Sequence, residues 1–240
     1  MFYRVILSHN QTEIIRNFPN GSFTVFVFDA PTEEDIKECK LYNSNYVIMQ
    51  EAGNRSNNRN AGIQKILNDF NPKDDDIIEF FDGDRFPVEY KPEIIEKIMQ
   101  QYDISCMLYS CQYDARQQKV FVPLSGATLI DTGTLCNSFY SCGFAMKVSD
   151  IKDIQNFNND MLFNNRFKSW GGEDQFLGLM CDYLKKRVAI TCETILNGRV
   201  GGDADQHEEY RYTLQTYIDL IKEFHFPFKV KPRPFEVLKI

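Results

Sequence analysis

Short apolar runs alternate with segments of helical periodicity along the first half of the chain. Runs of β-branched and aromatic residues predict buried strands, which we place at 3–7, 23–28, 46–49 and 77–81. Between them, caps and the spacing of apolar residues predict helices, which we place at 11–18, from Thr32 onward, at 57–70 and at 92–102. The alternation of strand and helix favours a parallel sheet covered by helices on both faces.

The second half of the chain is less regular. Its pattern predicts strands at 104–109, 120–123 and 188–192, and helices at 150–157, 175–186 and 210–224. The stretch 196–209 is polar and glycine-rich, which is typical of a loop, and the proline-containing tail 227–240 is expected to be extended. No internal repeat or low-complexity linker separates these segments, so we expect a single domain.

The composition supports a folded protein and excludes some functions. Hydrophobic residues make up 43% of the 240 residues, and the net charge is −7 with a pI near 5.1. An acidic chain without a basic cluster argues against a nucleic-acid partner. The chain starts on a predicted strand and contains no run of the roughly 18 apolar residues that a membrane helix needs. We therefore expect a soluble, cytoplasmic protein with no integral membrane segment; peripheral membrane association and oligomeric state stay open.

Two carboxylates follow the predicted strand 77–81 directly. They form the triplet Asp82-Gly83-Asp84. Alternate residues of a strand point the same way, so both carboxylates can face one cation, or a cation and a ribose. Oxygen ligands suit Mg²⁺ and Mn²⁺, which hold diphosphates. The glycine permits close approach of a ligand. On its own such a triplet is equally typical of a turn.

A second acidic signal opens the predicted helix at 175–186. The sequence Trp170-Gly171-Gly172-Glu173-Asp174 describes a tight loop that leads into a helix. Backbone N–H groups at such a point can bind a hydroxyl or an anion. The lone tryptophan of the chain beside two glycines suggests a platform for stacking a sugar. The alternative is an ordinary helix start with acidic first-turn residues and a core tryptophan.

Further polar residues fall at the ends of other predicted strands. Ser8-His9-Asn10 follows the first strand, and Asp29 follows the second. Arg59 and Asn60 lie near the start of the helix after the third strand, where they suit phosphate or ribose contacts. Ligands of parallel α/β sheets bind outside the carboxyl ends of the strands. These residues therefore converge on one edge if the sheet is real.

The order of these motifs resembles that of GT-A glycosyltransferases, particularly the inverting family-2 and β-4-galactosyltransferase types. The resemblance covers roughly residues 1–210 and rests on Asp29, Arg-Asn-x-Gly, Asp-x-Asp and Gly-Gly-Glu-Asp, in that order. It implies a mixed, mainly parallel, Rossmann-like sheet with flanking helices. It also implies a GT-A domain over 1–226, with a nucleotide-binding half at 1–102 and an acceptor and catalytic half at 103–226.

The resemblance also implies roles for individual residues. The donor is expected to be a sugar on a nucleoside diphosphate, UDP by preference, held with Mn²⁺ or Mg²⁺, and the acceptor a hydroxyl of a glycan or another molecule. Asp174, or less favourably Glu173, corresponds to the base that deprotonates this hydroxyl. Asp84, with Asp82 and His207, corresponds to the metal ligands. The remaining residues are expected to contact donor or sugar, namely Ser8, His9, Asn10, Asp29, Arg59, Asn60 and Gly83 on the donor side, and Trp170, Gly171 and Gly172 on the acceptor side.

Two departures and three rivals qualify the resemblance. The loop Asp29-Ala30-Pro31-Thr32 lacks the Asp-Gly-Ser of family 2, and one tryptophan replaces the pair found in the galactosyltransferases. A dehalogenase-type phosphatase also carries Asp-x-Asp, but on its first strand. A sugar-nucleotide pyrophosphorylase needs a basic, glycine-rich loop after the first strand, which is absent here. A GT-A module that binds sugar nucleotides or glycans without transfer is the third rival.

Overall fold

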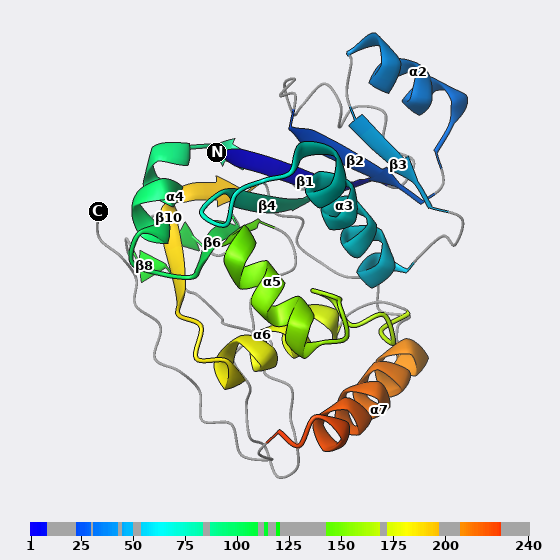
Figure 1. Cartoon of the computed structure of the whole chain (residues 1–240), viewed down its shortest axis with the longest axis vertical. Coiled ribbons are helices and arrows are strands. Elements are labelled where there is room, and N and C mark those ends of the chain that lie inside the picture. Colours follow the sequence, from blue (N-terminus) through cyan, green and yellow to red (C-terminus); the bar gives the residue numbers. More distant parts are fainter. Residues whose placement is uncertain are drawn as a thin grey trace.

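The structure of the chain is a computed structural model. It describes residues 1–8, 23–29, 31–42, 45–49, 54–83, 87–109, 113–114, 119–120, 143–168, 172–196 and 207–226. Figure 1 shows a central twisted sheet with helices packed across it. This arrangement is the predicted mixed α/β fold.

The sheet contains eight strands in the described part of the chain, six of which run in the same direction. The parallel strands are β1 (Phe2–Ser8), β2 (Thr24–Phe28), β3 (Asn45–Ile48), β4 (Ile77–Asp82), β6 (Ile104–Tyr109) and β10 (Val188–Leu196). The antiparallel strands are β5 (Pro87–Glu89) and β9 (Phe144–Lys147). The strand order is β3-β2-β1-β4-β9-β6-β10-β5. A separate two-stranded ribbon joins β7 (Tyr113–Asp114) to β8 (Lys119–Val120).

Helices cover both faces of the sheet. They are α2 (Glu33–Leu41), α3 (Arg55–Phe70), α4 (Pro92–Met99), α5 (Val148–Phe157), α6 (Glu173–Tyr183) and α7 (His207–Glu223). The larger core joins one sheet face to buried residues of α3, α5, α6 and α7, and the smaller core joins the other face to α2 and α4. In Figure 1, α3, α5 and α6 lie in front of the sheet.

Local sequence explains where several helices begin. Thr32 caps α2 through a reciprocal pair of hydrogen bonds with Asp35. The side chain of Asn54 accepts a hydrogen bond from the backbone N–H of Asn57 at the start of α3. Pro92 opens α4, where its missing N–H has no helical partner to lose. The predicted helices are confirmed at these three places, with α3 starting two residues earlier than expected.

Several features of the fold differ from the sequence prediction, which also contained neither β5 nor β7. Strand β9 was not predicted, yet it lies at the centre of the sheet between β4 and β6. Its residues Phe144, Ala145 and Met146 are fully buried, and α5 follows at once at Val148. The expected loop 196–209 was wrong at both ends, because β10 reaches Leu196 and α7 already begins at His207. The expected helix 11–18 and tail 227–240 lie outside the described residues.

Helix α3 approaches the sheet closely at Gly62. A Cβ atom at this position would lie 2.5 Å from Cγ1 of Val5 and 2.9 Å from Cγ2 of Val27. Both distances are below normal carbon contact, so the helix axis can be this near β1 and β2 only because residue 62 has no side chain. This contact sets the height of α3, and hence of Arg59 one turn earlier, above the sheet.

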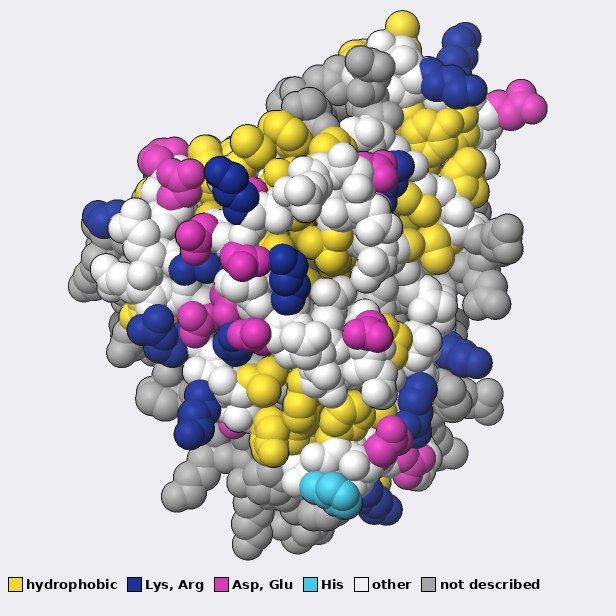
Figure 2. All heavy atoms as spheres, in the orientation of Figure 1, with side chains coloured by type: hydrophobic (Ala, Val, Ile, Leu, Met, Phe, Trp, Pro, Cys, Tyr) yellow, Lys and Arg dark blue, Asp and Glu magenta, His cyan; other side chains and the backbone are white. Residues whose placement is uncertain are grey.

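The surface carries both signs of charge. On the face in Figure 2, acidic and basic side chains are interspersed. The described ion pairs include Lys152 with Asp74 and Lys186 with Asp153. Among the described helices, none combines the length and the apolar character required to cross a membrane.

Replacing Gly62 with alanine tests the close approach of α3. Alanine raises helix propensity by about 1 kcal/mol, but overpacking a core of this kind costs about 1–3 kcal/mol. We expect Gly62→Ala to lower the free energy of unfolding, measured as a lower midpoint in urea. The matched control is Gln64→Ala in the same helix, where the side chain is exposed and stability should hold or rise. A Gly62→Ala protein as stable as this control would contradict the packing argument.

Candidate active site

The end of β4 presents a carboxylate at the carboxyl edge of the sheet. Ile78 and Phe80 pack into the larger core, and Asp82 is the next residue of the strand on that face. Its side chain keeps 23% of its surface exposed. Gly83 forms the turn that follows, and Asp84 lies outside the described residues. The strand thus delivers one carboxylate from the core to the rim of the sheet.

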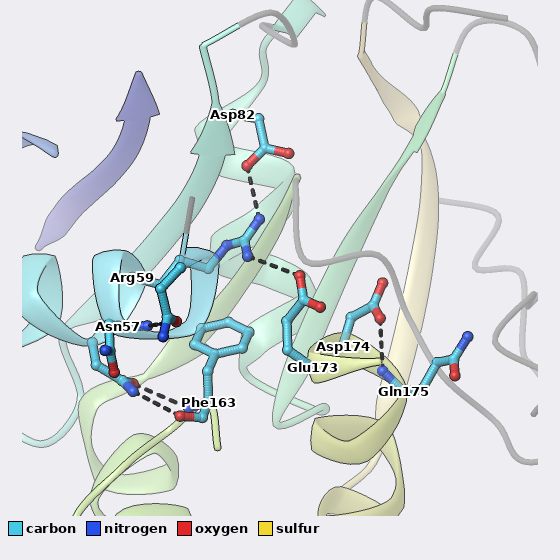
Figure 3. A network of polar contacts seen from close by, with 9 residues as sticks. Asn57, Arg59, Asp82, Phe163, Glu173, Asp174 and Gln175 are labelled. Carbon is cyan, nitrogen blue, oxygen red and sulfur yellow. Dashed lines mark hydrogen bonds and ion pairs between the residues drawn. The ribbon is translucent and has the colours of Figure 1, made fainter. Parts of the chain in front are cut away.

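Arg59 lies between that carboxylate and the start of α6. Its guanidinium is buried, with 1% of the side chain exposed. Nη2 donates to Oδ1 of Asp82 over 2.9 Å, and Nη1 donates to Oε1 of Glu173 over 3.1 Å. Figure 3 shows the side chain reaching from α3 to both acids. One cation therefore joins elements that are far apart in the chain.

An aromatic ring supports this guanidinium. The central carbon of the Arg59 guanidinium lies 5.3 Å from the ring centroid of Phe163, a cation–π distance. The Asn60 side chain holds the backbone of Phe163 at both polar atoms. Its amide donates to the carbonyl oxygen over 2.7 Å and its oxygen accepts from the N–H over 3.1 Å. Both described hydrogen bonds of the Asn60 side chain, a residue predicted to contact the sugar donor, therefore position this ring.

Gly172 controls where α6 begins. It is the N-cap with φ +91°, in the left-handed region that glycine adopts without strain. A Cβ here would also lie 2.5 Å from Cγ2 of Thr213 and 2.8 Å from the Phe167 ring. Glycine is thus required twice, by conformation and by space. The helix that follows opens with Glu173 and Asp174 and carries no side-chain cap.

The two acids at the start of α6 differ in environment. Glu173 is buried and pairs with Arg59, whereas Asp174 is half-buried and accepts a hydrogen bond from the N–H of Gln175 over 2.8 Å. Figure 3 shows both carboxylates on the side of the helix start that faces the end of β4. The two acids thus sit on one surface of the site, with only Asp174 partly open to solvent.

Burial and the negative charge of Glu173 together raise the pKa of Asp174 from 3.8 to about 7. The N–H of Gln175 and the charge of Arg59 oppose this rise. A carboxyl group whose pKa lies near 7 can accept a proton at neutral pH and hold it. Because its folded-state pKa lies above the ordinary value, Asp174 stabilises the fold below about pH 4, and this contribution is lost as the pH rises through 7.

Negative charge exceeds positive charge among the described groups of the site. Arg59 supplies one positive charge to Asp82 and Glu173, while Asp174 adds a further acid. Within the described part of the chain, Oε2 of Glu173 is buried without a hydrogen-bond partner. An unpartnered buried acceptor is costly unless a ligand supplies a donor or a cation. The chemistry of this set suits a bound cation or a ligand hydroxyl.

Two other predicted donor residues lie at the same edge of the sheet. Ser8 is the last residue of β1 and pairs with Phe28, so its buried side chain shares the face of the smaller core rather than that of Asp82. The backbone N–H of Asp29 donates to the carbonyl of Ser8 over 3.4 Å. The structure brings these residues to the predicted edge, where Ser8 lies on the face of the sheet opposite to Asp82.

The remaining predicted residues are described in part or not at all. His9, Asn10, Asp84, Trp170 and Gly171 lie outside the described residues. His207 is the first residue of α7, and only its backbone is described. No group of three or more His, Cys, Asp or Glu side chains with the arrangement of a metal site occurs among the described residues. The metal ligands therefore stay predictions.

The sequence reasoning missed two features of the site. Phe163 lies in an irregular segment after α5, where no pattern indicated a role. The bridging position of Arg59 did carry a signal, because Arg59 precedes the buried Ile63 by one helical turn and so occupies the buried stripe of α3. A charge on a buried stripe requires partners, and Glu173 and Asp82 are the ones it finds.

Comparison with known proteins gives matches of structure and none of sequence. A scan against protein-family models finds no match, and a search of curated proteins finds none either. The structure is similar to residues 1–349 of S. aureus TarS in complex with UDP, with 15% identity and a TM-score of 0.52 over 92% of this chain and 72% of that one. It is also similar to GalNAc-T7 with UDP, GalNAc and Mn²⁺, with 12% identity and a TM-score of 0.57 over 92% of this chain.

These similarities establish the class of fold. The sheet order and the matches to TarS and GalNAc-T7 identify the GT-A glycosyltransferase fold, as the order of the sequence motifs predicted. The chain spans 44% of a longer TarS chain and 47% of GalNAc-T7. At identities this low, the matches describe architecture, and activity has to be argued from the residues of the site.

The raised pKa of Asp174 can be tested through its neighbour. Glu173→Gln removes the negative charge that raises the pKa of Asp174, while the positive charge of Arg59, which lowers it, remains. The pKa of Asp174 should therefore fall below 7. Titration of ¹³C-labelled aspartate carboxyl groups by NMR measures it. The control Glu223→Gln changes an exposed acid paired with Arg166 and should leave Asp174 unchanged. An unaltered or higher pKa in Glu173→Gln would show that the Glu173 charge does not act on Asp174.

Proposed function

We propose that the protein is a glycosyltransferase. It moves a sugar from a nucleoside diphosphate, preferably UDP, to a hydroxyl group of a glycan or another acceptor, with a divalent cation and with inversion at the anomeric carbon. The observation that carries the proposal is that two elements bearing acids, the end of β4 and the start of α6, meet at one site through Arg59. Asp82 stands at the end of β4, and Asp174, whose pKa is raised to about 7, stands at the start of α6.

Asp174 is assigned as the general base. The acceptor hydroxyl is a weak nucleophile at neutral pH, and a carboxylate with a pKa near 7 can take its proton as the new bond forms. The acceptor oxygen then bonds to the anomeric carbon, the bond from that carbon to the β-phosphate oxygen breaks, and the nucleoside diphosphate leaves with the electron pair. Attack from the face opposite the leaving group inverts the configuration.

The donor side is assigned to the end of β4. Asp82, with Asp84 and His207 as further candidate ligands, supplies oxygen and imidazole groups that suit Mn²⁺ or Mg²⁺. A cation held there would neutralise charge on the diphosphate of the donor. The surplus of acidic groups and the unpartnered Glu173 oxygen described above support this assignment. Asp29 stays the candidate for the nucleobase, and Trp170 with Gly171 and Gly172 for the sugar.

The ligands in two structurally similar proteins support the assignment of a nucleotide donor and a divalent cation. One TarS structure holds UDP, and the GalNAc-T7 structure holds UDP, GalNAc and Mn²⁺. A module that binds the nucleotide without transferring sugar would share the fold but has no use for a base of raised pKa. A screen of common sugar nucleotides with Mn²⁺, following both hydrolysis and transfer, separates the two functions. Failure of every nucleotide to bind would refute both.

Replacing Asp174 with asparagine removes the base while keeping its shape. We expect turnover for transfer to fall by about 10²- to 10⁴-fold, the usual contribution of a general base, while affinity for the nucleotide in Mn²⁺ stays within about threefold, since binding does not use this proton acceptor. For the unaltered protein, turnover should rise with pH to a plateau above about 7.

The control for this substitution is Asp69→Asn, which removes an equal charge from the exposed end of α3 and should leave turnover unchanged. Rates come from a nucleotide-release assay, and affinities come from calorimetry. Near-normal turnover in Asp174→Asn would mean that another group is the base.

Removal of the divalent cation tests the donor side. With EDTA present, affinity for UDP should fall at least about tenfold, since the diphosphate charge then faces acidic side chains without compensation. UMP lacks the second phosphate that a cation would bridge, so its weaker binding should change little. Calorimetry with both nucleotides, with and without Mn²⁺, provides the measurement. Equal affinity for UDP in both conditions would exclude a cation at this site.

A further inference from the structure

The geometry points to Arg59 as a positioning residue, which we propose holds the donor side and the acceptor side of the site at a fixed separation. This inference rests on the proposed function. Arg59 uses different nitrogens for its two partners, Nη2 for Asp82 and Nη1 for Glu173. Asp82 belongs to the strand assigned to the donor, and Glu173 precedes the assigned base. The guanidinium is thus a physical link between the strand assigned to the donor and the helix start assigned to the acceptor.

The surroundings of Arg59 restrict the orientation of its guanidinium. The side chain is 1% exposed, so the group has little room to turn toward a ligand. The ring of Phe163 lies against it, and that ring is fixed by two hydrogen bonds between its backbone and Asn60. A planar fork held in one orientation sets both distance and angle between its two carboxylates. A lysine has a single ammonium and cannot reproduce this geometry.

Loss of the link should displace the acceptor side more than the donor side. Without a shared cation, the partly exposed Asp82 and the buried Glu173 are like charges that repel one another. The start of α6 has no side-chain cap, so the ion pair from Arg59 to Glu173 is what orients its first acids, and Asp174 moves with Glu173. Sugar transfer needs the acceptor oxygen and the anomeric carbon in close alignment. Hydrolysis of the donor by water does not, because a water molecule can approach from a wider range of positions.

The chain contains a matched ion pair for comparison. Arg4 of β1 donates through Nε to Oε2 of Glu79 over 2.9 Å, and Glu79 is fully buried in β4. Tyr90 donates to the same carboxylate. Because Glu79 and Asp82 are separated by an odd number of positions, this pair lies on the opposite face of the same strand. Arg4→Lys therefore disturbs a partly buried arginine–carboxylate pair between β1 and β4 without touching the Arg59 cluster.

The experiment compares the ratio of transfer to hydrolysis in Arg59→Lys and Arg4→Lys. We expect Arg59→Lys to lower this ratio by about 10- to 100-fold, as a displacement on the order of 1 Å would, while Arg4→Lys keeps the ratio of the unaltered protein. Thermal melting of both variants shows whether their stability losses are comparable. Calorimetry should find the affinity for UDP and Mn²⁺ within about threefold of normal in both, since the link acts on alignment rather than on binding.

Glu173→Gln provides a second variant if Arg59→Lys folds poorly. It weakens one arm of the link and keeps the cation. It should therefore also lower the ratio at about pH 8.5, where Asp174 is ionised in both proteins and its lowered pKa does not change the fraction of active base. The double variant Arg59→Lys/Glu173→Gln should be no worse than the more damaged single variant. Ratios in Arg59→Lys and Glu173→Gln equal to that in Arg4→Lys would overturn the role of Arg59 and leave the proposed function intact. An unaltered protein that neither binds nor cleaves any sugar nucleotide would overturn the proposed function, and this inference with it.

Discussion

A guanidinium that is almost wholly removed from water has to find negative partners, and this requirement organises the site. The effective penalty for burying one ion is several kcal/mol, and Arg59 is compensated by two carboxylates from two separate elements. A single positive charge therefore fixes the positions of helix α3, strand β4 and the start of helix α6 relative to one another. The position of Asp174 depends on that arrangement, because Asp174 directly follows Glu173, which Arg59 binds.

Glycines at two points allow the elements to come this close. Gly62 lets α3 rest on β1 and β2, and Gly172 lets α6 start against Phe167 and Thr213. At each position a Cβ atom would collide with neighbouring side chains. Each helix can therefore lie this close to its neighbours only because the residue is glycine. The charged cluster then forms in the space between the two helices. Backbone approach and ion pairing thus act together, the first setting where the helices lie and the second fixing how they face.

The N-terminal part of the fold could be read from the sequence because its elements are local. Strands β1, β2 and β4 are largely apolar runs, and α2 and α3 carry caps and apolar stripes that depend only on neighbouring residues. Strand β9 could not be read in this way. It has four residues, leads directly into α5, and is defined by partners from distant parts of the chain. Short strands carry little periodicity, so pairing alone reveals them.

The candidate site follows the same division between local and distant information. The acids Asp82, Glu173 and Asp174 were found from motifs that lie within a few residues. The bridge through Arg59 and the support by Phe163 depend on side chains brought together over more than a hundred positions, and spacing along the chain cannot express such contacts. The sequence could indicate that Arg59 needs a partner, whereas the choice of Glu173 belongs to the tertiary structure.

The central place of β9 has a consequence for how the chain reaches this structure. β4 and β6 both pair with β9, a strand that is synthesised after both of them. Until it arrives, each of these two strands exposes an edge with unpaired backbone groups, which is an aggregation hazard. Completion of the sheet is therefore a late, long-range event, and contacts of that kind slow folding. The two parts of the sheet on either side of β9 share this strand, so they would form as one cooperative unit.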